Sequence, residues 1–430
     1  MKNSGVEWIG EIPDEWEVSK IGQLYEERIT KVSDTVYPPL SVTMQGILPQ
    51  LENAAKSDAH DDRKLVLKGD FAINSRSDRR GSCGISNFNG SVSLINTVLH
   101  PKTEMNPIYY NWLFHSFRFS DEYYKNGHGI VDDLWTTSWS EMKKIFIPLP
   151  PKETQQRIAS YLDKKCSKIE ETIQNQQQVI EKLKAYKQSL ITEAVTGKVK
   201  IVNGKACGEY ESYKDSGVEW IGKIPSEWKK CKFTRIIIDT RNGLSRRDLN
   251  KSTGNLVLKL KNINPDGNID LTETNRIELS KNEIQNYQLQ NDDFLFVRVN
   301  GSKSLVGKCA IYKTIENIVA YNDHIIRVRF NLNLCNVYYI KYLLQSSYAK
   351  YDIANHIKTA AGQFTISSED LCNLICLLPS IDEQKSIADY LNKKCLVIDN
   401  AIEQKQKLIE KLAEYKKSLI YEVVTGKRIV

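Results

Sequence analysis

The sequence predicts an α+β protein: two mixed α/β domains, each followed by a long α-helix, with the two helices paired as an antiparallel coiled coil. Three observations predict this fold. The chain holds two copies of one plan, each copy ends in a long stretch of helical periodicity, and the segment before each stretch alternates strand-like and helix-like runs. A chain of 430 residues is also long enough for two or three domains.

The two copies open on a tryptophan motif. SGVEWIGEIPDEW at residues 4–16 returns as SGVEWIGKIPSEW at 216–228, with eleven of thirteen positions identical. The middle segments that follow, residues 17–149 and 229–378, show almost no match to each other. Since near-identical ends flank dissimilar middles, we expect the ends to hold a common assembly and the middles to act differently in each half.

The predicted domains follow from this plan. We expect a first mixed domain, a first long helix, a linker, a second mixed domain and a second long helix, at residues 1–150, 151–198, 199–214, 215–379 and 380–430.

The helical ends repeat closely, because IEKLKAYKQSLITEAVTGK at 180–198 returns as IEKLAEYKKSLIYEVVTGK at 409–427. Gly197 and Gly426 stand where a C-terminal cap belongs. Roughly 40 helical residues would make a rod of about 60 Å. Its apolar stripe needs a partner, so we favour pairing of the two helices over separate packing on their own domains. The predicted stripe residues are Ile158, Leu162, Ile169, Ile173, Ile180 and Leu183 in the first helix and Ile387, Leu391, Ile398, Ile402, Ile409 and Leu412 in the second.

The middle segments both predict strands, turns and aromatic helices. In the second, NLVLKLKNI, DDFLFVRV, CAIYK and DHIIRVRF are typical of strands. In the first, KLVLKGDFAINS and SVSLINTVLH play the same part, and NPIYYNWLFHSF and NVYYIKYLLQSSYAKY are corresponding helices. Each middle ends in a hydrophobic strand that runs into proline. The two middles are therefore expected to share a fold.

Composition and termini narrow the class of protein. No apolar run approaches the ~20 residues that span a bilayer, and the N-terminus lacks the pattern of a signal peptide. Nine cysteines at irregular spacing do not resemble a disulfide framework, and Cys372 and Cys376 lack a second pair with zinc-site spacing. We expect no metal, no membrane partner, a reducing compartment and a cytoplasmic location.

Motifs of catalysis are missing from the sequence. GVEWIGK at 217–223 has the spacing of a phosphate-binding loop, but Ile224 stands where Ser or Thr must hold magnesium. No Asn-Pro-Pro-aromatic or Asp-Pro-Pro-aromatic tetrad and no glycine-rich Rossmann turn is present, and the six histidines show no paired metal spacing. The sequence therefore does not support a catalytic role.

Basic turns are the candidate DNA-reading sites, because arginine reads guanine edges bidentately and asparagine reads adenine. A turn at Asn74–Ser82 follows the strand KGDFAI, and a turn at Arg298–Ser304 follows DDFLF, at the same place in each middle. A basic stretch from Lys229 to Asn262, with ten basic and two acidic residues, could attract a polyanion. Polar loops at 127–135 and 358–365 precede the last strand of each half. The candidate residues are Asn74, Arg76, Arg79, Arg80, Arg241, Arg246, Arg247, Lys259, Lys261, Arg298, Asn300 and Lys303.

Taken together, these features resemble the specificity subunit of type I restriction-modification systems. The resemblance covers essentially the whole chain and is carried by the duplicated GVEWIGxIPxEW, the helix ends AVTGK and VVTGK, and the Pro-x-x-x-Glu-Gln start of the second helix at 379–384. The first helix start departs from this pattern, with Thr154 in place of Glu383.

The resemblance implies a non-catalytic DNA-binding subunit of a DNA adenine methyltransferase and type I endonuclease complex. Each recognition domain would bind one half of a bipartite double-stranded DNA site, and the helices would set the spacer. Half-sites one helical turn apart need a span of about 35 Å. Two methyltransferase subunits would dock on the helices and two restriction (motor-nuclease) subunits would complete the complex. No cofactor is implied in this chain: S-adenosylmethionine belongs to the methyltransferase subunits, and ATP and Mg to the restriction subunits.

A second hypothesis is a coiled-coil adaptor that binds protein partners through its variable middles. Binding that is insensitive to salt would favour the adaptor, because phosphate contacts weaken steeply as ionic strength rises. A single-chain nuclease or methyltransferase is disfavoured by the missing motifs.

Overall fold

The computed structural model describes residues 1–50, 61–129, 135–246, 253–264, 267–360 and 362–430. The chain divides into two compact units. Unit 1 comprises Met1–Gln178 and Lys405–Val430, and unit 2 comprises Val179–Gln404. Each unit includes part of both long helices, so the division into units does not follow the predicted division into helices and mixed domains. The predicted boundaries stay a prediction.

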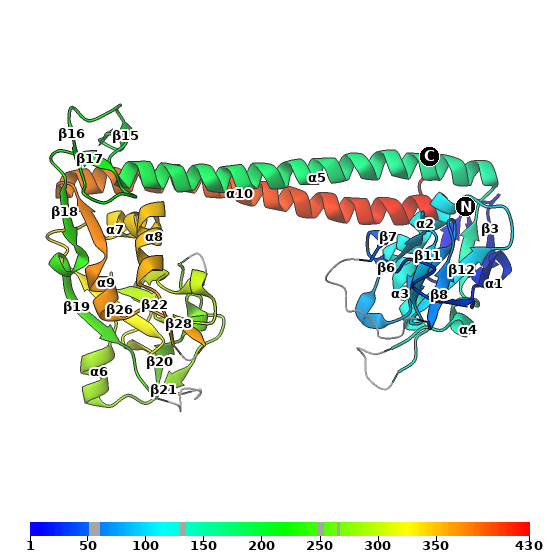
Figure 1. Ribbon diagram of the computed structural model, residues 1–430, viewed down its shortest axis with the longest axis horizontal. Coiled ribbons are helices and arrows are strands. Elements are labelled where there is room, and N and C mark those ends of the chain that lie inside the picture. Colours follow the sequence, from blue (N-terminus) through cyan, green and yellow to red (C-terminus); the bar gives the residue numbers. More distant parts are fainter. Residues whose placement is uncertain (51–60, 130–134, 247–252, 265–266, 361) are drawn as a thin grey trace. The chain divides into compact units, whose positions relative to one another are not determined.

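The two long helices are α5 (Lys152–Val195) and α10 (Ile381–Val424), and their parts lie side by side within each unit (Figure 1). In unit 1, Glu170 pairs with Lys416, while Gln176 Oε1 accepts a hydrogen bond from Lys405 Nζ at 3.0 Å. As residue numbers rise along α5, those of its partners fall along α10, so the pair is antiparallel, as predicted. In unit 2, Lys187 pairs with Asp399 at 2.6 Å.

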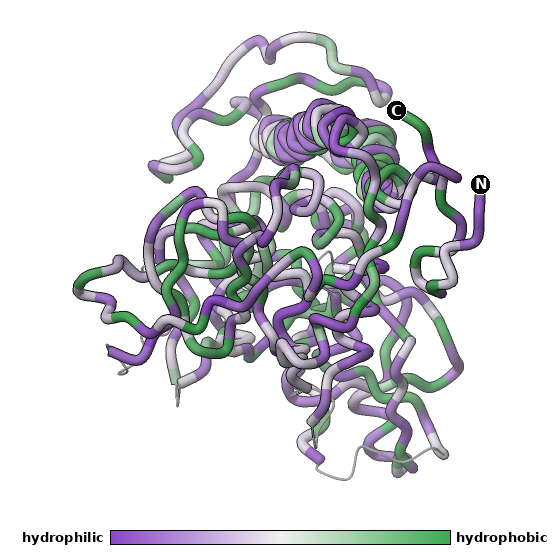
Figure 2. The backbone as a smooth tube through the Cα atoms, turned by 90° about the vertical axis from the view of Figure 1, so that its right-hand side faces the viewer, coloured by the Kyte–Doolittle hydropathy of each residue, from purple (hydrophilic) through white to green (hydrophobic). Residues whose placement is uncertain are grey.

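The predicted stripe residues lie on the inner faces of these helices. Ile158, Leu162, Ile387 and Leu391 are at most 2% exposed, and the other eight are buried or half-buried. Figure 2 shows the long helices end-on, and both hydrophilic and hydrophobic residues occur along them. The antiparallel pair is therefore stabilised by one apolar face of each helix.

Each long helix ends in a glycine that packs on a tryptophan motif. Gly197 has φ +72° and Gly426 has φ +73°, the left-handed conformation of a helix C-cap. A Cβ on Gly197 would lie 2.3 Å from Pro225 Cδ, and one on Gly426 would lie 2.3 Å from Pro13 Cδ. The second tryptophan motif therefore packs on the end of α5, and the first packs on the end of α10.

Each unit contains an antiparallel four-stranded sheet with the same strand order. In unit 1 the order is β10 (Cys83–Ile85), β9 (Phe71–Asn74), β12 (Asn96–Pro101), β4 (Tyr25–Glu27). In unit 2 it is β24 (Cys309–Ile311), β22 (Phe294–Val297), β26 (Ile325–Phe330), β19 (Ile237–Asn242). Paired helices follow β12 and β26: α2 (Pro107–His115) and α3 (Phe117–Lys125), and α7 (Val337–Gln345) and α8 (Ser347–His356). The predicted common fold of the two middles is confirmed.

The second sheet of each unit differs in strand direction. In unit 1, β8 (Arg63–Val66) pairs antiparallel with β11 (Gly90–Ser93) and β5 (Lys31–Val32). In unit 2, β20 (Asn255–Leu258) pairs parallel with β25 (Val319–Tyr321) and antiparallel with β21 (Arg276–Ile277). The shared fold is therefore closest in the four-stranded sheet and its helices.

Short strands and helices complete the two units. The last strand of each middle pairs with its first: β13 (Phe146–Leu149) with β3 (Glu17–Lys20), and β29 (Ile375–Leu378) with β18 (Lys229–Lys232). The short helices are α1 (Ile21–Leu24), α4 (Trp139–Met142), α6 (Lys281–Tyr287) and α9 (Ser368–Asn373). The short strands are β1 (Lys2–Asn3), β2 (Glu11–Ile12), β6 (Leu40–Thr43), β7 (Gly46–Pro49), β14 (Ile201–Val202), β15 (Lys205–Ala206), β16 (Tyr213–Asp215), β17 (Lys223–Pro225), β23 (Val299–Asn300), β27 (Lys358–Ala360) and β28 (Gln363–Thr365).

The residues 199–214, predicted to be a linker, belong to unit 2 and pack against its core. Ile201 is 2% exposed, and Tyr210 donates a hydrogen bond to Glu383 near the start of α10. Burial and the adjacent Glu383 carboxylate raise the pKa of the Tyr210 hydroxyl, which keeps it a donor.

An aromatic core joins the sheet to the long helices in each unit. In unit 1, the α2 residue Tyr109 is fully buried and donates a hydrogen bond to the carbonyl of Val424 at 2.9 Å. Phe71 of β9 packs on Phe114 with ring centroids 4.5 Å apart. In unit 2, Tyr342 of α7 donates to an asparagine side chain of α10 at 2.8 Å. The helices after β12 and β26 thus fix each sheet to the coiled coil.

The nine cysteines are all free, in agreement with the spacing argument. Of the helices that the structure describes, none combines the length and the apolarity that crossing a membrane requires.

Candidate nucleic-acid interface

The two predicted basic turns occupy equivalent places in the two four-stranded sheets. The first basic turn (Asn74–Ser82) connects β9 to β10, and the second basic turn (Arg298–Ser304) lies between β22 and β24. Cys83 pairs with Ile73 across the first sheet, and Cys309 pairs with Phe296 across the second. The strands before the two turns share the sequence pattern D-F-x-x, at residues 70–73 and 293–296. This shared pattern therefore marks strands that place both turns at the same edge of the same fold.

A buried carboxylate holds the start of each of these strands. Asp70 accepts from Arg28 at 2.7 and 3.0 Å and from the Leu67 backbone N–H at 2.8 Å. Asp293 accepts from Arg329 at 2.7 and 3.1 Å and from the Gln290 N–H at 2.7 Å. Bidentate pairs of this kind fix geometry strongly, so the aspartate of each D-F pair positions the strand that carries the basic turn.

The first basic turn presents arginines to solvent. Arg76, Arg79 and Arg80 are exposed, and the Arg79 side chain is 69% accessible. Asn74 is buried instead, and its Oδ1 accepts from the Arg76 backbone N–H at 3.1 Å. The guanidinium of Arg80 lies 5.3 Å from the centre of the Tyr124 ring. In this turn Asn74 shapes the backbone, while the arginines are placed to contact a polyanion.

In the second basic turn, more of the predicted side chains form hydrogen bonds within the protein than in the first. Arg298 Nη1 donates to the Asp323 carbonyl at 3.0 Å, and Asn300 Oδ1 accepts from the Ser302 N–H at 2.8 Å. Lys303 is exposed at the tip. Of these three predicted residues, Lys303 is the one whose charged group is directed to solvent, while Arg298 and Asn300 stabilise the turn.

Polar loops predicted at 127–135 and 358–365 lie beside the basic turns. In unit 2, β23 pairs with β28, and β28 pairs with β27. In unit 1, the bridges Arg76–Thr136 and His128–Thr136 make the same arrangement in shorter form. Residues 130–134 and 361 lie outside the described residues. The structure therefore brings two predicted loops together in each unit, which the sequence alone did not indicate.

The remaining predicted residues form contacts within unit 2. Arg241 Nη1 donates to Asn286 Oδ1 at 2.8 Å, Arg246 pairs with Glu283 at 3.1 Å, and Lys261 pairs with Glu273. Burial first, and Lys261 second, lower the pKa of Lys259. Arg247 lies outside the described residues. The local count of ten basic and two acidic residues missed these acidic partners, because they come from residues after 262.

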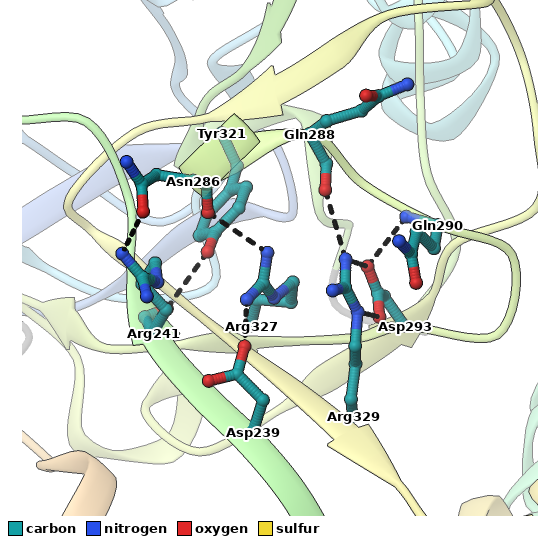
Figure 3. A network of polar contacts seen from close by, with 9 residues as sticks. All are labelled: Asp239, Arg241, Asn286, Gln288, Gln290, Asp293, Tyr321, Arg327 and Arg329. Atoms are coloured by element: carbon teal, nitrogen blue, oxygen red, sulfur yellow. Dashed lines mark hydrogen bonds and ion pairs between the residues drawn. The ribbon is translucent and has the colours of Figure 1, made fainter. Parts of the chain in front are cut away.

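A polar network that the sequence analysis missed lies on one face of β26 (Figure 3). Arg327, whose side chain is 3% exposed, pairs with Asp239 of β19 and donates to the Asn286 carbonyl at 3.3 Å. Arg329 pairs with Asp293, as described above. The alternation in IIRVRF is the signal: Ile326, Val328 and Phe330 belong to the hydrophobic core, so the arginines face the other side. This network stabilises the sheet that carries the second basic turn.

The arrangement suits contact with a polyanion. Exposed guanidinium and ammonium groups stand on turns held by buried ion pairs, and such groups bind phosphates and base edges. Among the described residues, no group of three or more His, Cys, Asp or Glu side chains is placed to hold a metal ion.

Comparison with known proteins identifies the family. The family described as the type I restriction modification DNA specificity domain matches residues 13–182 and 245–413. The EcoKI specificity subunit of Escherichia coli K12 is 27% identical over 283 residues, which cover 66% of this chain and 57% of that subunit. The aligned part thus spans little more than half of that relative.

Two further comparisons cover nearly the whole chain. The MjaVIII specificity subunit of Methanocaldococcus jannaschii is 25% identical over 433 residues, 97% of this chain and 93% of that subunit. A solved chain, from work on complex assembly and conformational transition of the type I R-M system, has a TM-score of 0.74 at 14% identity and covers 97% of this chain and 100% of its own length. That likeness shows the fold. On the two family matches, which span most of its length, this chain belongs to the type I restriction modification DNA specificity family and carries its domain twice.

Proposed function

We propose that this chain is the DNA-specificity subunit of a type I restriction-modification complex, in which each middle segment reads one half of a bipartite DNA site. The observation that carries the proposal is the pair of basic turns at equivalent places in two sheets of the same strand order. The turns share a position but not a sequence, so the two halves of the DNA site would differ. Family membership supports the DNA partner.

The division of labour follows from the same proposal. This chain supplies base recognition and performs no chemistry. Two methyltransferase subunits, which carry S-adenosylmethionine, dock on the paired helices and methylate an adenine in each half-site. Flipping that adenine out of the duplex is the work of the methyltransferase. Two motor-nuclease subunits, which use ATP and Mg, complete the restriction enzyme.

The test is methylome sequencing of a host that expresses this chain with its methyltransferase subunit, compared with a host lacking this chain alone. We expect one bipartite N6-methyladenine motif to disappear when the chain is removed. Replacement of residues 17–149 by the same segment of another family member should then change one half of the motif and leave the other half intact.

Unchanged methylation in the presence of an active methyltransferase subunit would refute the proposal. A second measurement separates it from the protein-adaptor hypothesis. Binding to a motif-containing duplex should weaken steeply with salt, because released counterions drive association with phosphates. An interaction with partners that is insensitive to salt would favour the adaptor.

A further inference from the structure

A basic groove lies within unit 2 and shares two residues, Lys303 and Ser304, with the second basic turn. It has a volume of about 1020 Å³ and is walled by α5, α10, the helices α7 and α8, and the segment from Lys303 to Cys309. Among the described residues that line the groove, Asp399 is the one carboxylate, and it is already paired with Lys187 at 2.6 Å. Its lysines, named here the lysine groove, are Lys184, Lys187, Lys303, Lys308, Lys341 and Lys350.

Two of the six lysines of the lysine groove pair with carboxylates, Lys184 with Glu181 at 2.9 Å and Lys187 with Asp399. Burial lowers the pKa of Lys350, and the nearby Lys308 and Lys187 lower it further. The Lys350 ammonium donates to Gln188 Oε1, a neutral partner. Within the described part of the chain, no carboxylate pairs with Lys303, Lys341 or Lys350. Three lysines of the groove therefore lack a carboxylate partner among the described residues, and an anion placed there would be attracted to them.

The chemistry of the groove matches phosphate rather than base edges. Lysine is a compact point charge that binds phosphate, whereas bidentate reading of guanine is best served by the planar fork of arginine. The floor is apolar, with Ile191, Val306 and Ile353 among its lining residues, and partial exclusion of water strengthens charge contacts. Lys303 belongs both to the groove and to the second basic turn, so the two surfaces are continuous.

Unit 1 lacks this concentration of lysines at the corresponding positions. The repeat between the long helices matches Lys184 to Ala413 and Lys187 to Lys416. Asn106 and Asn336 are the equivalent N-caps of α2 and α7. Counted from these caps, Lys341 corresponds to Asn111 and Lys350 corresponds to Ser120. The paired strands match Lys308 to Ser82. Of these five lysines, one is retained in unit 1, so the lysine groove distinguishes unit 2 from unit 1.

We infer that the lysine groove binds phosphates of the DNA duplex beside the half-site read by unit 2, anchoring that side of the complex without reading bases. The inference rests on the proposed function. It adds an asymmetry between the two halves: unit 1 holds DNA through its exposed arginine turn, and unit 2 adds a lysine site that extends from its basic turn to the long helices.

The test replaces two groove lysines by the residues that unit 1 has at the same positions. The variant Lys341→Asn with Lys350→Ser is compared with Lys205→Ser with Lys223→Asn, a pair of exposed lysines of unit 2 outside the groove. Each is assembled with the methyltransferase subunit, and the Kd for a duplex carrying the methylated motif is measured between about 50 and 200 mM salt. The slope of log Kd against log salt should fall by about 0.9 for each phosphate that the protein no longer neutralises, so by about 1.8 in the groove variant. The control variant should keep the wild-type slope, and the methylated motif should be unchanged in both.

An unchanged slope in a groove variant that still recognises the motif would overturn the inference and leave the proposed function standing. Loss of methyltransferase assembly in place of a salt effect would also overturn it, because the groove would then hold an acidic protein segment. A wild-type complex with no preference for the motif would instead refute the proposed function itself. If the double variant fails to fold by circular dichroism, Lys341→Asn alone carries the test, with a slope change of about 0.9.

Discussion

At the scale of single residues, one buried glutamine at the start of each long helix binds the N-terminus of a core helix, α7 in unit 2 and α2 in unit 1. Gln384 Oε1 accepts from the Asn336 backbone N–H at 2.8 Å, and its Nε2 donates to the carbonyls of Pro379 and Leu334 at 3.0 and 3.2 Å. Gln155 makes the equivalent contacts with Asn106 and Pro150 in unit 1. Since both side chains are at most 2% exposed, water cannot replace these hydrogen bonds.

The glutamine clamp leads to a stability prediction. Gln384→Ala leaves one buried N–H and two carbonyls without this partner, which should lower the free energy of unfolding of unit 2 by about 2–4 kcal/mol. Gln404→Ala is the matched control, because Gln404 is an exposed glutamine of the same helix and the same unit and should change stability by less than about 0.5 kcal/mol. Scanning calorimetry measures both. Equal transitions for the two variants would show that the clamp is not stabilising.

At the scale of elements, the ends of the long helices are joined to the tryptophan motifs by close backbone approach. Gly197 and Gly426 need a left-handed conformation, and each also needs the space that a Cβ would fill against a proline. Tyr421 reinforces the second junction by donating to the carbonyl of Trp8 at 3.1 Å. The strong identity of the repeated ends therefore has a packing reason: helix end and tryptophan motif must fit each other.

Two alanine substitutions separate the two energetic costs of adding a Cβ at this junction, which are left-handed backbone strain and the clash with proline. Gly222→Ala introduces a Cβ at φ +72° with no atom within 4 Å, so it should cost only the left-handed strain of about 1–2 kcal/mol. Gly197→Ala carries the same strain and adds the clash with Pro225, which should cost about 1–3 kcal/mol more. Urea unfolding of the two variants gives the difference. Equal midpoints would mean that the motif yields to the methyl group without cost.

At the scale of the whole molecule, the chain builds two units from one fold with different turns. In unit 1 the basic turn keeps its arginines exposed, whereas Arg298 of the second basic turn donates to the Asp323 carbonyl at 3.0 Å. The two units therefore expose different groups at equivalent positions, which under the proposed function is how each would read a different half-site.

The independence of the halves gives the third prediction. Arg79→Gln with Arg80→Gln should weaken DNA binding and reduce the salt slope by up to about 1.8, because two exposed guanidiniums are removed. Stability should be nearly unchanged, since both side chains are more than half exposed. In the methylome, relaxed specificity should be confined to the half-site assigned to residues 17–149. Relaxation in both half-sites would contradict independent reading.

Several features were predictable because their physical signals are local in sequence. The apolar stripe of Ile158, Leu162, Ile387 and Leu391 predicted the helix faces, and the D-F-x-x strands predicted equivalent turns. Other features were not predictable, because they depend on side chains brought together by folding. The basic stretch around Arg246 is one example, since its acidic partner Glu283 lies 37 residues away.

Periodicity and repetition are properties of the chain, so they were enough to infer the duplicated plan, the paired helices, the shared fold of the middles and the resemblance to a DNA-specificity family. Which charged groups remain available to a partner could be read from the folded chain alone. Arg298 and Asn300 are used to hold their own turn, whereas Lys187, Lys341 and Lys350 meet from three helices in one groove. Whether a charge is satisfied or exposed depends on neighbours distant in sequence, and folding alone sets those neighbours.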